Sequence, residues 1–241
     1  MPPGGANPSN TNDILAFMKE RSSNGDITAL DVMLSAILLF YVVSPEYIRL
    51  LLEPEPQYLS TEGPNQAFPV HDRGTHPNVL DHDNDNGEPM PVEENSVLLT
   101  ASLWRTNATG NAPWSGPAGT YTPLLKKYAD LSVESNGLHI PSQRSTVDGL
   151  GPMAGKTNLA ITSMVALNTF SVLSGNSSHS KRGLYYASQL YNSTGGLGQV
   201  LVQPYPISHY KPETCMIMST SASLLPGIFT PSSFSASALS L

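Results

Sequence analysis

Apolar residues recur at helical spacing in several segments of the chain, and long polar stretches separate these segments. The first pattern is short and amphipathic: Ile14, Leu15, Phe17 and Met18. Residues 26–43 form a longer apolar run that fits a helix. Ser44 and Pro45 predict the start of another helix, because serine can cap a helix and proline suits its first position. That helix should end before Pro54, since the residue before a proline is disfavoured in a helix.

The second half of the chain predicts further helices. One should begin at Pro91, a second spans residues 121–131, a third spans residues 157–173, and a weaker pattern covers residues 183–190. Long polar loops lie between the helices, and the longest runs from residue 54 to 91. Alternating strand patterns are scarce. The sequence therefore predicts an all-α domain built of helical hairpins.

Composition divides the chain into three parts. Residues 1–12 are rich in proline, glycine and asparagine and are predicted to be disordered. Residues 13–199 carry the helical patterns and form the predicted helical hairpin domain. Residues 200–241 show no helical period and are rich in serine, threonine and proline, so we expect an irregular tail.

Charge and hydropathy exclude two classes of partner. The formal net charge is -7 and no cluster of lysine and arginine occurs, which argues against nucleic-acid binding. The most apolar run, residues 32–43, is too short to cross a bilayer, which takes about 20 residues, so no membrane partner is expected. A small-molecule substrate is the expected partner, and the sequence does not define the oligomeric state.

Motifs for cofactors and metals are missing from the sequence. Cys215 is the only cysteine, so neither an intrachain disulfide nor a thiolate metal site can form. The chain has no GxSxG elbow, P-loop or dinucleotide fingerprint, and we predict no cofactor and no metal. No signal peptide opens the chain. Three glycosylation sequons hint at an extracellular protein, and they begin at Asn107, Asn176 and Asn192.

The stretch from His71 to Glu94 concentrates the residues that can do chemistry. Pro91 places Glu93 and Glu94 in the first turn of a helix, where free N–H groups and the helix dipole favour carboxylates. Adjacent helical residues point about 100° apart, so one glutamate can face a cavity while the other supports it. Carboxylates from different loops can activate a water molecule. The structural alternative is that acidic residues simply prefer helix N-termini.

Two cation sites are weaker interpretations of the same stretch. The first is a calcium loop formed by alternating aspartates, although Asn86 stands where such a loop requires glycine: Asp81, Asp83 and Asp85. The second is a zinc site formed by three histidines whose spacing does not match a helical zinc motif: His71, His76 and His82.

The order of short motifs resembles the fungal glutaminase A-like family. The stretch HDRGTHPNVLDHDNDNGEPMPVEE is similar to the family's HDLG, YPNA, GH-DG-DE and MPVEE elements. SSNGD with LDV, SPE with LLLEP, and GKTNLAI resemble further family segments, so the resemblance covers Phe17 to Gly175. The sequence departs from the pattern in four places: Arg73 replaces the leucine of HDLG, residues 81–88 rearrange the GH-DG-DE element, Ser96 and Val97 stand where a Gly-Asn pair is usual after MPVEE, and Val147 replaces the first aspartate of TDDF.

The resemblance implies an (α/α) helical-hairpin barrel of the six-hairpin glycosidase type, here incomplete and with long loops. It also implies a secreted enzyme that hydrolyses L-glutamine to L-glutamate and ammonia. Glycoside hydrolysis by the same barrel is the alternative activity. A truncated chain without activity is the non-catalytic alternative.

Candidate residues follow from the matched motifs. The resemblance makes Glu93 or Glu94 the general base or acid, with Asp72 as its partner. His71 would orient the substrate or shuttle a proton. Three further positions are predicted to bind substrate: Asp148 at the TDDF element, Asn158 at the NLAI helix and His82 at the GH-DG-DE element.

Overall fold

The computed structural model describes residues 14–20, 25–61, 67–80, 88–110, 116–134, 140–145 and 151–192. These residues form α-helices and three isolated β-bridges, with no strand among them, so the all-α prediction is confirmed. The helices are α1 Leu30–Val43, α2 Pro45–Leu52, α3 Pro54–Leu59, α4 Pro91–Thr109, α6 Thr122–Glu134, α7 Thr157–Ser174 and α8 Ser178–Asn192. The predicted disordered N-terminus, residues 1–12, and the predicted tail, residues 200–241, lie outside the described residues.

The chain divides into two compact units, Met1–Tyr186 and Ala187–Leu241. Only residues 187–192, at the end of α8, are described in the second unit. All packing and chemistry below belong to the first unit.

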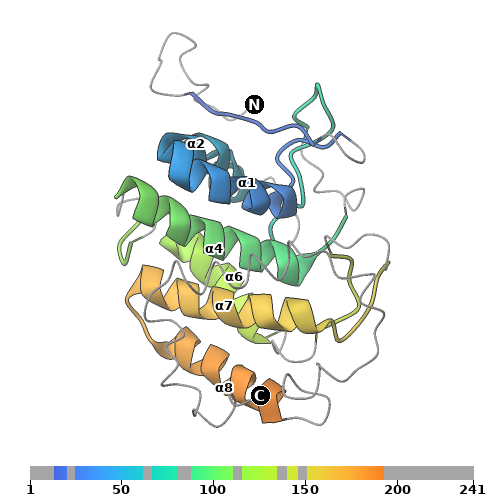
Figure 1. Cartoon of the computed structure of the whole chain (residues 1–241), viewed down its shortest axis with the longest axis vertical. Coiled ribbons are helices and arrows are strands. Elements are labelled where there is room, and N and C mark those ends of the chain that lie inside the picture. The colour runs from blue at the N-terminus through green and yellow to red at the C-terminus, as the bar shows by residue number, and fades with distance from the viewer. Residues whose placement is uncertain are drawn as a thin grey trace. The chain divides into compact units, whose positions relative to one another are not determined.

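Helix α4 is the centre of the first unit. It packs most extensively against α7 and also contacts α1, α2 and α6. Figure 1 shows α4 in green between the blue α1–α2 pair and the yellow-orange α7. The side chains from Glu94 to Arg105 are buried, because neighbours cover this helix on most sides. No described helix combines the length and apolar character needed to cross a membrane.

Small polar residues let α4 be buried on several faces. The Ser96 hydroxyl donates to the carbonyl of Val92 at 2.6 Å, and the Ser102 hydroxyl donates to the carbonyl of Leu98 at 2.7 Å. Such bonds to the preceding turn satisfy a hydroxyl without a partner from another helix. These two buried serines of α4 therefore cost little in lost hydrogen bonds, whereas the buried Ser163 hydroxyl on α7 has no hydrogen-bond partner among the described residues.

Proline positions set most helix starts as predicted. Helix α2 begins at Pro45 and ends at Leu52, and α4 begins at Pro91. The prediction that residues 54–91 form one loop is wrong at its beginning, because α3 starts at Pro54. Proline lacks the N–H that a first turn leaves unpaired, so it can open this short helix directly after α2.

The predicted helix at residues 14–18 is also wrong. This segment is extended: the Ala16 N–H donates to the carbonyl of Leu50, and the Thr28 N–H donates to the carbonyl of Met18. Residues 26–29, predicted as the start of a helix, are not helical either: Asp26 and Ile27 form β-bridges, Thr28 has a φ of 55°, and α1 begins only at Leu30. Long-range backbone pairing outweighs local helical preference in both segments.

Candidate active site

Backbone hydrogen bonds hold the HDRG loop against the segment that precedes α1. The Leu30 N–H donates to the carbonyl of His71 at 3.0 Å, and the Arg73 N–H donates to the carbonyl of Ile27 at 2.8 Å. The Ile27 N–H donates to the carbonyl of Gly74 at 2.8 Å. Two segments far apart in sequence thus fix each other. The loop presents His71 and Asp72 from a rigid support.

A tight turn orients Asp72. Its Oδ1 accepts a hydrogen bond from the Gly74 N–H at 2.7 Å, an arrangement typical of aspartate in turns. Gly74 has a φ of 112°, a left-handed conformation that side chains disfavour and glycine permits. On the facing segment, Asp26 Oδ1 accepts a hydrogen bond from the Thr75 hydroxyl at 3.2 Å. Both carboxylates are buried, and each accepts a hydrogen bond from a residue of the loop.

Helix α4 supplies the partner of His71. His71 Nδ1 lies 3.5 Å from Glu94 Oε1, and the two side chains are 7% and 0% exposed. Glu94 is in the first turn, where its own N–H donates to the carbonyl of Met90. The distance exceeds that of a normal hydrogen bond, and the contact is an ion pair when the imidazole is protonated. Such contacts often tighten when a substrate binds.

Burial and charge act in opposite directions on this pair. Burial alone would lower the pKa of His71, but contact with Glu94 and the charges of Asp31 and Asp72 outweigh burial and raise the pKa to about 9. Burial raises the pKa of Glu94 to about 7, and the nearby His71 offsets only part of this rise. Between these values the pair holds a positive imidazole and a negative carboxylate. Such perturbed groups are typical of functional sites.

The same region contains a set of side chains that could hold a cation. Asp26, His71 and Asp72 each have a ligand-type atom within 4.8 Å of the other two, and all three are buried. Carboxylates and imidazole are ordinary metal ligands. Here, however, both carboxylates also accept hydrogen bonds from the loop. We therefore interpret the set as part of an acid–base site.

The other predicted site residues have different positions. Glu93 is half-buried beside Glu94, and its charge contributes to the raised pKa of Glu94. Asn158 is half-buried in the first turn of α7, and no described hydrogen bond or ion pair joins its side chain to His71, Asp72 or Glu94. His82 and Asp148 lie outside the described residues.

The alternative cation sites of the sequence gain no support. His76, proposed for the zinc set, is exposed, whereas His71 is buried, and His82 is not described. The aspartates of the proposed calcium loop, residues 81–85, lie outside the described residues.

Sequence reasoning missed two contributors to the site. Asp26 faces His71 and Asp72 only because of the long-range pairing described above, which no local pattern indicates. Asp31 acts on His71 through its charge. Arg73, the departure from the family's leucine, packs 4.0 Å above the Tyr58 ring. It also forms an ion pair with buried Glu55, whose Oε2 lies 3.8 Å from Nη1, so the buried charge is compensated.

The profile of the glutaminase A six helical-hairpin domain matches residues 5–214. The chain belongs to this glutaminase A family. The family match extends past Gly175, the last residue of the sequence resemblance, and also past both ends of the predicted domain at residues 13–199. No solved structure matches the chain significantly.

Two curated relatives carry the family resemblance. Glutaminase A of Aspergillus oryzae is 31% identical over 169 residues, which make up 69% of this chain and 24% of that protein. A protein of Arthroderma benhamiae named "Probable glutaminase" is 32% identical over 138 residues, 56% of this chain and 16% of that protein. The chain therefore spans less than a quarter of the length of these glutaminases.

Proposed function

We propose that this chain forms part of a glutaminase-type amidohydrolase that converts L-glutamine and water to L-glutamate and ammonia. The observation that carries the proposal is the buried contact between His71 and Glu94, with Asp72 next to it in the chain. The names of the two curated relatives support the choice of substrate.

His71 is the proton donor in this proposal. It is the least buried of the three groups, at 7% exposed against 1% for Asp72 and 0% for Glu94, so substrate would reach it first. Its pKa of about 9 keeps the imidazole protonated at neutral pH. Glu94 acts as a positioning residue that holds this charge. The imidazolium gives its proton to the amide nitrogen as ammonia leaves.

Asp72 is the proposed general base. The Gly74 N–H fixes one carboxylate oxygen, which sets the direction of the group. Asp72 takes a proton from water while the water oxygen bonds to the amide carbon. The carbon–nitrogen bond then breaks, and the proton from His71 makes the leaving group neutral. Glu93, which is half-buried, is the alternative base. Asn158, His82 and Asp148 stay as predicted substrate contacts.

Ammonia release from L-glutamine tests the proposal. Removing a general acid or base typically costs about 10²- to 10⁴-fold in rate. We therefore expect at least about a hundredfold loss of kcat for His71→Asn and for Asp72→Asn. Glu94→Gln should lower kcat and also shift the pH profile, because it acts through His71. Glu134→Gln, an exposed change on α6, is the matched control and should keep full activity.

Three outcomes would overturn the proposal. One is a folded chain that releases no ammonia. Another is activity that Asp72→Asn and His71→Asn both leave intact. The third is release of sugar from aryl glycosides in place of ammonia, which would favour the glycoside hydrolase alternative. A full loss in Glu93→Gln with an unaffected Asp72→Asn would move the base from Asp72 to Glu93.

A further inference from the structure

A second group of reactive side chains lies where α6 meets the start of α8, outside the site around His71. The Ser178 hydroxyl lies 3.2 Å from His179 Nδ1. His179 Nε2 lies 2.8 Å from Asp130 Oδ1, which joins α8 to α6. Serine, histidine and aspartate thus form one hydrogen-bonded chain. None of the three residues lies in a motif that carries the family resemblance.

The two contacts of His179 indicate which of its ring nitrogens carries the hydrogen when the imidazole is neutral. Asp130 lies next to Lys126 and His179, and their hydrogen bonds outweigh the effect of burial and hold the pKa of this carboxyl below its usual range. The carboxylate accepts, so His179 Nε2 carries the hydrogen. In neutral imidazole the other nitrogen is then an acceptor. His179 Nδ1 consequently accepts from the Ser178 hydroxyl, which is the arrangement that activates a serine nucleophile.

The histidine and the serine of this group differ in exposure in the way that a serine nucleophile and its base require. His179 is 7% exposed, and the Phe170 ring packs edge-on against it at 4.9 Å between ring centroids. Ser178 is exposed. The base is therefore fixed inside the protein, while the hydroxyl can meet a ligand. Related triads occur on unrelated folds and are defined by geometry rather than sequence position.

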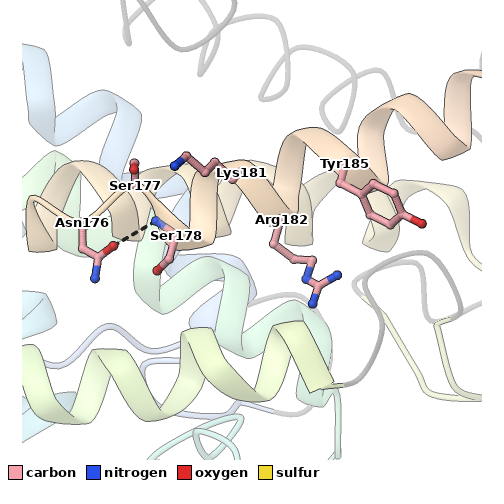
Figure 2. Close-up of a pocket in the computed structure, with 6 residues that line it drawn as sticks. All are labelled: Asn176, Ser177, Ser178, Lys181, Arg182 and Tyr185. Atoms are coloured by element: carbon pink, nitrogen blue, oxygen red, sulfur yellow. Dashed lines mark hydrogen bonds between the residues drawn. The ribbon is translucent and has the colours of Figure 1, made fainter.

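The serine hydroxyl opens onto a pocket. The pocket has a volume of about 450 Å³ and is lined by Asn176, Ser177, Ser178, Lys181, Arg182 and Tyr185. In Figure 2 the Ser178 side chain and the Arg182 guanidinium extend from the same side of α8, as residues four apart in a helix do. Asn176 Oδ1 accepts a hydrogen bond from the Ser178 N–H at 2.9 Å. The asparagine side chain therefore satisfies this backbone N–H, and the serine hydroxyl does not.

We propose that Ser178, His179 and Asp130 form a second hydrolytic site that cleaves esters carrying a negative charge. The Ser178 oxygen bonds to the ester carbonyl carbon while its proton passes to His179 Nδ1. The bond from carbon to the leaving oxygen breaks, and the alcohol leaves with that proton. Water then attacks the acyl-serine by the same route. The products are one carboxylic acid and one alcohol.

Charges around the pocket select the substrate class. Lys181 and Arg182 line it, and neither forms an ion pair with a carboxylate in the described part of the chain. Two cations favour a ligand with a carboxylate or another anionic group.

At the start of α8, the Ser178 N–H binds Asn176 and the Ser180 N–H binds the Ser171 hydroxyl. The His179 N–H is the first-turn donor that we assign to the developing oxyanion.

Covalent labelling tests the nucleophile. The full chain, produced in bacteria so that the Asn176 sequon carries no glycan, is treated with a fluorophosphonate and measured by intact mass and peptide mapping. We expect one adduct, on Ser178. Ser178→Ala should lose it, and His179→Gln should slow labelling at least about tenfold, because the general base is removed. Ser174→Ala, a nearby serine outside the pocket, is the control and should label normally.

Ester hydrolysis tests the substrate class. Mono-p-nitrophenyl succinate carries a carboxylate, and p-nitrophenyl butyrate is a neutral ester of similar length. We expect kcat/KM to favour the anionic ester about tenfold, and Arg182→Gln should remove most of this preference. A chain that gives no adduct, an adduct that persists in Ser178→Ala, or labelling that His179→Gln does not slow would overturn the nucleophile. Equal rates on the two esters would overturn the substrate class.

Discussion

Two histidine–carboxylate pairs lie in the described part of the chain, and they differ in how much water surrounds them. His71 and Glu94 are 3.5 Å apart, and the glutamate is fully buried. His179 and Asp130 are 2.8 Å apart, and the aspartate side chain is 42% exposed. Burial raises the pKa of Glu94 to about 7, whereas hydrogen bonds hold the pKa of Asp130 below its usual range. The two carboxylates therefore differ in their net pKa shift, because desolvation outweighs the hydrogen bonds and nearby cations at Glu94 but is outweighed by them at Asp130.

The comparison predicts unequal stability losses when the carboxylate is removed. Glu94→Ala leaves His71 in the interior without its nearest anion, and breaking a buried pair costs about 3–5 kcal/mol. Asp130→Ala removes a carboxylate that water partly surrounds, and the cost should be about 1 kcal/mol or less. Urea unfolding of both variants, followed by circular dichroism, gives the two free energies of unfolding. Similar losses of unfolding free energy in the two variants would contradict the conclusion that burial makes the first pair more important for stability.

The buried pair also predicts that stability falls as pH rises. His71 has a pKa of about 9 in the folded chain against an ordinary value of 6.5, so its contribution is complete below about 6.5 and is lost as pH rises through 9. Glu94 has a pKa of about 7 against an ordinary 4.5, so the folded chain again holds the extra proton, and stability declines between these values. The melting temperature should therefore drop between pH 6 and 9.

The control for this pH effect is His71→Asn, which lacks the imidazole. Its melting temperature should depend less steeply on pH between 6 and 9 than that of the wild-type chain. Parallel curves would mean that other groups cause the drop. In the activity assay, the proposed glutaminase reaction should be fastest between about 7 and 9, where Glu94 is ionised and His71 is protonated.

Local sequence predicted the parts of the fold that local rules control. Prolines marked the starts of α2 and α4, and the apolar pattern marked α7. The pairing of residues 26–29 with the HDRG loop could not be predicted this way, because its hydrogen bonds join distant segments. The structure makes Asp26 a neighbour of Asp72 for the same reason.

The two sites show the same difference between residues that local motifs predict and contacts that only long-range packing creates. His71, Asp72 and Glu94 were predicted because they lie in motifs that resemble a family. Asp130 and His179 belong to different helices, and no motif links them. Only the packing of α8 near α6 makes them partners. A single sequence carries little information about such contacts when no spacing rule connects the residues.

A smaller effect is expected where α8 approaches α7 closely. A Cβ atom on Gly183 would lie 3.0 Å from the carbonyl oxygen of Met164, and backbone cannot move aside as easily as a side chain. Gly183→Leu should destabilise the chain by about 1–3 kcal/mol, as overpacking usually does. Leu184→Ala, at an exposed position next to it, should stay within about 0.5 kcal/mol. A stable Gly183→Leu variant would mean that the two helices can separate freely there.

The smallest expected effect concerns the lysine beside Asp130. Lys126 and Asp130 form an ion pair one turn apart on α6, and their side chains are 58% and 42% exposed. Exposed pairs of this kind contribute about 0.3–0.5 kcal/mol, which salt screens. Lys126→Gln should therefore change the free energy of unfolding by no more than this, and the change should vanish in 1 M salt, where the screening length is about 3 Å. A loss several times larger that persists in salt would show that Lys126 supports the contact between Asp130 and His179, and the second pair would then resemble the buried one.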